Sequence, residues 1–71
     1  MNDTINNRML TLRVEHDIPR VTLAKELGLT TNTIYRIEKK GDTPHVYTVM
    51  AYAEYFGVST DWILFGKEHE E

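Results

Sequence analysis

The chain has 71 residues, a formal net charge of −3 at pH 7 and no cysteine. This length allows one small domain near the lower limit for independent folding, and the lack of cysteine excludes disulfide bridges and thiolate metal sites. The first five residues are too polar for a signal peptide, and no apolar run is long enough to span a membrane. Stability must therefore come from a compact core, completed if necessary by a second chain.

The charged side chains are unevenly distributed along the chain. Residues 1–40 hold seven basic and five acidic side chains, whereas residues 41–71 hold one basic and six acidic side chains. An acidic chain is not expected to bind nucleic acid, but the net charge of +2 on residues 1–40 favours contact of that half with a polyanion. Ordinary scatter of surface charge is the alternative explanation.

Helical periodicity dominates the chain, and no convincing alternating strand is found. A first helix is expected from about Thr4 to His16, with Asp3 or Thr4 as its N-cap. Its apolar face consists of Ile5, Met9, Leu12 and, at its edge, Val14. Pro19 suits the start of a second helix, because its missing N–H would have no partner there. The four further helices are expected over residues 20–27, 31–39, 45–56 and 61–65.

Residues 23–38 predict two short helices separated by a glycine. The first helix has an apolar stripe formed by Leu23, Ala24 and Leu27. Gly28 follows where helices often end in the left-handed conformation, and Thr30 is a good N-cap for the second helix. That helix buries Ile34 and Ile37 and turns polar side chains outward. Short donors and one Arg at the start of such a helix are typical of a helix-turn-helix, which places them against base edges of DNA.

Five short helices with short connections predict a compact all-α domain. This domain is expected to span residues 1–66, followed by a charged C-terminal tail over residues 67–71. The predicted core consists of Met9, Leu12, Ile18, Leu23, Ala24, Leu27, Ile34, Ile37, Val49, Tyr52, Ala53, Phe56, Val58 and Ile63.

Several short segments are characteristic in combination. They are Leu23-Ala24-x-x-Leu27-Gly28-Leu29-Thr30, Thr33-Ile34-x-x-Ile37-Glu38, Gly41 with Pro44, Ala53-x-x-Phe56-Gly57-Val58-Ser59, and Asp61-Trp62-Ile63-Leu64-Phe65-Gly66. In this order and spacing the chain resembles the phage repressor and Cro type of helix-turn-helix protein, the XRE family. The resemblance extends from Arg8 to Gly66 and implies a five-helix, lambda-repressor-like DNA-binding domain.

The chain departs from the family pattern at two positions. The family usually has Gln in the first turn of the second helix, where it reaches a phosphate and braces the recognition helix, whereas this chain has Arg20. An Arg can still hold a phosphate. The family also tends to have glycine two residues after the glutamate. Here Lys40 stands at that position and Gly41 follows one residue later.

The resemblance implies two groups of DNA contacts on and around the third helix. Base readout is expected from its outward face, where Asn can pair with adenine and Arg with guanine; this group is Thr31, Asn32, Tyr35 and Arg36. Phosphate contacts are expected at the margins of that face; this group is Arg20, Thr30, Thr33, Lys39 and Lys40. The alternatives are a solvated helix face, a solvated loop and, for Thr30, capping alone.

Two further roles concern residues outside the DNA-facing surface. In the family an Arg near the end of the first helix meets a Glu near the end of the third. This implies an ion pair between Arg13 and Glu38 that orients the recognition helix. Trp62, Leu64 and Phe65 are many large apolar residues for the end of so small a domain, so they are expected either in the core or at a two-fold dimer interface.

No catalytic, metal or cofactor site is expected. His16, His45 and His69 lack metal-ligand spacing. The sequence has no nucleophile–base arrangement or glycine-rich phosphate loop, and no pocket is expected in so small a core.

The predicted function is that of a sequence-specific, DNA-binding transcriptional regulator. It is expected to be a Cro-like or short phage-type repressor in the cytoplasm of a bacterium or phage-infected cell, acting as a homodimer on a palindromic operator. No membrane or small-molecule partner is expected. The alternatives are an antitoxin that represses its own operon, a truncated domain of a longer regulator, and an antirepressor-like interaction module that does not bind DNA.

Overall fold

The structure, a computed structural model, describes residues 3–67. This part of the chain is all-α, as predicted, and contains no strand. Its elements are α1 (Ile5–Glu15), α2 (Arg20–Leu27), α3 (Thr31–Tyr35), the π-helical turn η1 (Arg36–Lys40), α4 (Val46–Phe56) and α5 (Thr60–Phe65). Most of the predicted tail, including His69, lies outside the described residues.

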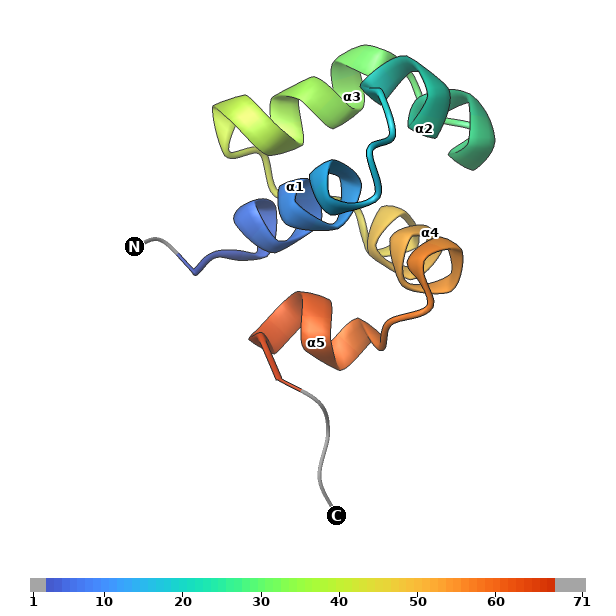
Figure 1. The fold of residues 1–71 in the computed structure, drawn as a ribbon. Coiled ribbons are helices and arrows are strands. Elements are labelled where there is room, and N and C mark those ends of the chain that lie inside the picture. The colour runs from blue at the N-terminus through green and yellow to red at the C-terminus, as the bar shows by residue number, and fades with distance from the viewer. Residues whose placement is uncertain (1–2, 68–71) are drawn as a thin grey trace.

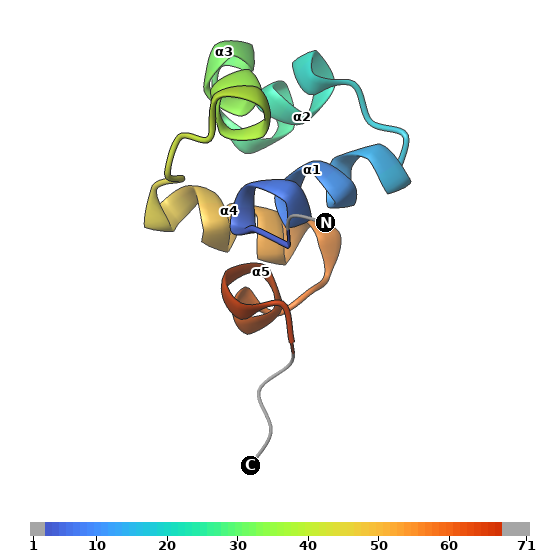
Figure 2. The ribbon, with the colours of Figure 1, turned by 90° about the vertical axis from the view of Figure 1, so that its left-hand side faces the viewer.

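The helices are arranged in three tiers (Figures 1 and 2). α2 and α3 form the upper tier, α1 and α4 the middle tier and α5 the lower tier. α3 continues into η1, which packs against α1, while α5 packs against both α1 and α4. The predicted recognition helix and the apolar C-terminal helix therefore lie at opposite ends of the molecule.

Local capping signals set the helix limits. Thr4 Oγ1 accepts a hydrogen bond from the Asn7 N–H at 3.1 Å, and Ser59 Oγ accepts one from the Trp62 N–H at 3.0 Å. α2 ends at Gly28, whose φ of +70° lies in the left-handed region that glycine adopts without strain. Because such signals depend on neighbouring residues only, four of the five predicted helices agree with the structure to within one residue at each end.

The third helix differs from the prediction of a regular α-helix to Lys39. α3 ends at Tyr35 and is followed by a wider π turn over residues 36–40. The carbonyl of Arg36 accepts the N–H of Gly41, five residues later, and that of Asp42 at 3.2 Å. Gly41, with a φ of +73°, ends the turn. This glycine comes one residue later than in the family pattern, and a π turn accommodates one more residue than an α turn.

The predicted core is confirmed. Ten of the fourteen predicted residues are buried, and the other four, Ile18, Leu27, Phe56 and Val58, are half-buried against them. The expectation for Val14 was wrong. Its side chain is 52% exposed, because it follows Leu12 by two residues and so lies on the opposite side of α1. Arg8 and Thr48 are buried polar residues that the hydrophobic pattern does not predict.

Candidate nucleic-acid interface

The outward face of α3 and the start of η1 carry the four residues predicted to read bases. Thr31, Asn32, Tyr35 and Arg36 are all exposed, and their spacing places them on one side of a helix. Ile34 and Ile37 are buried on the other side. The packing of these two isoleucines therefore fixes which face of the helix points away from the protein.

Two threonine hydroxyls form a small donor site at the start of α3. Thr30 Oγ1 accepts a hydrogen bond from the Thr33 N–H at 3.1 Å and lies 2.8 Å from Thr33 Oγ1. One of the two hydroxyl protons bridges the oxygens, which leaves the other proton available for an external acceptor. Capping and a phosphate contact are thus compatible in this pair.

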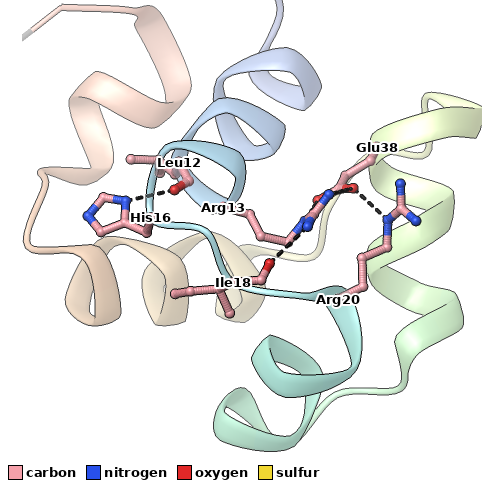
Figure 3. A network of polar contacts seen from close by, with 6 residues as sticks. All are labelled: Leu12, Arg13, His16, Ile18, Arg20 and Glu38. Carbon is pink, nitrogen blue, oxygen red and sulfur yellow. Dashed lines mark hydrogen bonds and ion pairs between the residues drawn. The ribbon is translucent and has the colours of Figure 1, made fainter.

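A buried ionic cluster, formed by Arg13, Arg20 and Glu38, lies behind this face (Figure 3). Arg13 donates from Nε to Glu38 Oε2 at 2.6 Å and from Nη2 to Oε1 at 3.0 Å. Its Nη1 donates to the carbonyl of Ile18 at 2.8 Å. The Glu38 side chain is fully buried, and its hydrogen bond raises the pKa of Arg13 above the ordinary value. The cluster joins α1, the loop before α2, and η1.

Arg20 occupies the position where the family pattern has Gln. Its Nε donates to Glu38 Oε1 at 2.7 Å, and its two terminal nitrogens point away from Glu38 in Figure 3. The guanidinium also lies over the ring of Tyr35, 5.4 Å from the ring centroid. Arg20 therefore braces the recognition helix through Nε and presents its remaining donors outward.

Arg36 forms a contact that the sequence did not predict. Its Nε donates to Asp42 Oδ2 at 2.7 Å, and its Nη2 donates to Asp42 Oδ1 at 3.3 Å. Both side chains are about half exposed. Lys39 and Lys40 are exposed in the same turn, so three basic side chains lie together at the end of the recognition helix.

Asn6 joins α1 to this turn. Its Nδ2 donates to the carbonyl of Ile37 at 2.9 Å and to the carbonyl of Asp42 at 2.7 Å. These bonds tie η1 and the residue after its C-cap to α1. The sequence holds no signal for this role beyond an amide side chain beside an apolar position.

The C-terminal helix carries the residues predicted for a dimer interface. Trp62 is half-buried against the core, whereas Leu64 and Phe65 are 43% and 69% exposed. α5 is held by the buried Arg8, whose Nε donates to the carbonyl of Ile63 at 2.8 Å and whose Nη2 donates to that of Leu64 at 2.9 Å. The sequence did not assign this role to Arg8.

An apolar groove of about 480 Å³ lies next to α5. Its lining consists of Ile5, Thr43, Pro44, Val46, Val49, Met50, Thr60 and Leu64. This groove lies open on the surface between helices and is not a pocket within the core. Val46 and Met50 remain 60% and 52% exposed along this groove.

The remaining expectations concern metals and membranes. Among residues 3–67, no three acidic or histidine side chains are grouped as a metal site would require. His16 lies with Nδ1 2.7 Å from the carbonyl of Leu12, and His45 accepts the N–H of Tyr47, so each has a local structural role. None of the helices in residues 3–67 has the length and apolarity that a membrane span requires.

The fold and the exposed face of α3 define a helix-turn-helix protein. A helix-turn-helix family model matches residues 9–63. The chain therefore belongs to the helix-turn-helix family of DNA-binding transcription regulators.

Among solved structures, the chain is similar to the P22 c2 repressor protein in complex with a synthetic operator. The TM-score is 0.82 and the sequence identity 21%, with 93% of this chain and 100% of that chain covered. No curated protein sequence matches this chain.

Proposed function

We propose that this protein is a sequence-specific transcriptional repressor that binds a palindromic DNA operator as a homodimer. The observation that carries the proposal is the exposed polar face of α3 and η1, which a buried ionic cluster holds in place. Bound over a promoter, such a protein acts by steric exclusion of the polymerase.

Base readout is assigned to the exposed face. Asn32 offers the amide that pairs with adenine, and Arg36 offers the guanidinium that pairs with guanine, each pair giving about 1–3 kcal/mol of discrimination. Thr31 is suited to a thymine methyl group or a phosphate, and the Tyr35 ring to the sugar–phosphate backbone.

Phosphate contacts are assigned to the margins of this face. The spare hydroxyl proton of the Thr30–Thr33 pair lies at the start of α3, where free N–H groups and the helix dipole attract anions. The outward nitrogens of Arg20 and the exposed Lys39 and Lys40 surround the same face. These groups explain how a chain with a net charge of −3 can bind a polyanion.

A homodimer is assigned to the α5 end of the molecule. The exposed Leu64 lines the apolar groove together with Val46 and Met50, and the neighbouring Phe65 is exposed as well, so several large apolar side chains are uncovered on and beside α5. A two-fold dimer of this class places its recognition helices about 34 Å apart, one turn of DNA.

The proposal is tested by selecting bound sequences from random double-stranded DNA with the full chain. We expect an enriched inverted repeat whose affinity falls steeply with salt. The Arg36→Ala variant should lose preference at one base pair in each half-site, and the matched control Lys67→Ala, which removes a positive charge beyond α5, should keep it. Unselective binding would contradict the proposal and favour an interaction module that does not read DNA.

A further inference from the structure

The Arg36–Asp42 pair places a carboxylate at the edge of the proposed DNA-facing surface. An acid at this place repels phosphate, so its presence there needs an explanation. Stability does not supply one, because exposed ion pairs contribute little to folding. Arg36 and Asp42 side chains are 50% and 41% exposed.

The position of Asp42 is fixed by its backbone. Its N–H donates to the carbonyl of Arg36 at 3.2 Å, and its own carbonyl accepts from Asn6 Nδ2 at 2.7 Å. Gly41, in the left-handed conformation, reverses the chain between the two residues. Both the N–H and the carbonyl of Asp42 are therefore hydrogen-bonded, and this fixed backbone places its carboxylate against the side chain of Arg36.

The geometry of the pair leaves one edge of the guanidinium free. Asp42 occupies Nε and Nη2, which lie along the side edge of the group. The end edge, formed by Nη1 and the second hydrogen of Nη2, keeps two donors that point along the side chain. Guanine offers two acceptors in the major groove, O6 and N7, which match such a pair of donors.

We propose that Asp42 is a specificity-determining positioning residue that holds Arg36 for end-on recognition of guanine. The inference rests on the proposed function and deepens it. The carboxylate fixes the plane of the guanidinium, which reduces the freedom lost on binding. It also makes the same guanidinium less available to a phosphate, so that Arg36 contributes to selectivity more than to general affinity.

The experiment compares the 71-residue chain with its Asp42→Asn variant in sequence selection and in titrations against operator and random duplexes. Asn keeps the size of the side chain and removes its charge. We expect the preference at the Arg36-dependent base pair, about 5- to 150-fold for a good bidentate contact, to fall to a few-fold. Affinity for random DNA should rise, and preference at the Asn32-dependent base pair should not change.

Three variants make the interpretation specific. Arg36→Ala identifies the base pair concerned. Glu26→Gln removes an exposed acid from α2 and should raise affinity for all sequences without changing preference. Asp42→Glu keeps the charge but moves it by one methylene, so it should lose preference without a gain in affinity for random DNA. Circular dichroism establishes that each variant is folded.

Each alternative result overturns the inference. If Asp42→Asn raised affinity for all sequences equally, as Glu26→Gln should, Asp42 would act only through its charge. If it sharpened the preference for guanine, Asp42 would compete with DNA rather than position Arg36. If the wild-type protein binds DNA selectively and Asp42→Asn gives either of these results, only this inference is overturned. If the wild-type protein binds DNA without sequence preference, the proposed function is overturned as well.

Discussion

The recognition segment carries ionic contacts of similar length in opposite surroundings, at Glu38 and at Arg36. Arg13 and Glu38 approach to 2.6 Å and Arg36 and Asp42 to 2.7 Å. The Glu38 side chain is fully buried and that of Arg13 is 12% exposed, whereas about half of Arg36 is open to solvent. An ion pair between an arginine and a carboxylate is therefore found both in the buried region behind α3 and on the exposed surface.

This difference in burial indicates different roles. Removing one partner of a buried pair leaves an uncompensated charge in a medium that solvates it poorly, so the Glu38 cluster is expected to be structural. Water and salt screen the exposed pair, so breaking it costs little. The buried cluster can thus keep α3 in place, while the exposed pair contributes little to stability and is suited to a role in recognition.

The largest expected effect on stability comes from disrupting the buried cluster around Glu38. Glu38→Gln leaves Arg13 and Arg20 facing a neutral group, and we expect a loss of about 3–5 kcal/mol in the free energy of unfolding. Urea denaturation followed by circular dichroism measures this loss. The exposed Glu26→Gln control should change stability by no more than about 0.5 kcal/mol. A loss below about 1 kcal/mol for Glu38→Gln would show that the cluster is dispensable.

Arg8 tests whether burial alone decides how much a charged contact contributes to stability. Arg8 is buried but binds backbone carbonyls of α5 together with the exposed carboxylate of Asp3. Arg8→Met retains much of the volume and leaves those carbonyls without a donor, which should cost about 2–3 kcal/mol. Denaturation followed by the fluorescence of Trp62, the single tryptophan of the chain and a residue of α5, reports on this contact. An unchanged midpoint would contradict the assignment.

Tyr52 is a buried residue near the cluster around Glu38 whose hydroxyl group provides a further test of stability. Its side chain is fully buried, and its hydroxyl has no hydrogen-bond partner among residues 3–67. Tyr52→Phe removes an unsatisfied group, so stability at pH 7 should stay within about 1 kcal/mol or increase. A loss above about 2 kcal/mol would contradict this, as it would require a bond to that hydroxyl.

The same residue gives a pH dependence. Burial raises the pKa of Tyr52 above its ordinary value near 10. Above pH 10 the unfolded chain therefore releases this proton before the folded chain does, and the folded state loses stability as pH rises. Tyr52→Phe should reduce that loss, as measured by urea denaturation between pH 9 and 11. The exposed Tyr47→Phe provides the matched control for the removal of a phenolic hydroxyl.

The smallest expected effect on stability comes from breaking the exposed Arg36–Asp42 pair. Asp42→Asn should change the free energy of unfolding by no more than about 0.5 kcal/mol, because the Arg36–Asp42 pair is solvated. Thermal unfolding at low and high salt measures it. A loss close to that of Glu38→Gln would remove the distinction between the two contacts and make Asp42 a structural residue.

Local signals explain how much of the fold could be predicted. Thr4, Thr30 and Ser59 cap helices through bonds to residues three positions later, and Gly28 ends one through its own backbone. Helical periodicity identified the buried faces for the same reason. The π turn escaped prediction, because the position of Gly41 shows that the helix ends late but not how the intervening residues are wound.

The features of the candidate site can also be separated into those that the sequence predicted and those that only the structure revealed. The sequence by itself determined which residues of α3 face outward, because Ile34 and Ile37 must be buried together, and the family resemblance implied that Arg13 meets Glu38. Only the tertiary structure decided that Arg20 joins this cluster, that Arg8 holds α5, and that Asp42 returns onto Arg36. The physical reason is that periodicity specifies which face of a helix leaves water, whereas the partner of a charged side chain depends on how the chain folds back in space.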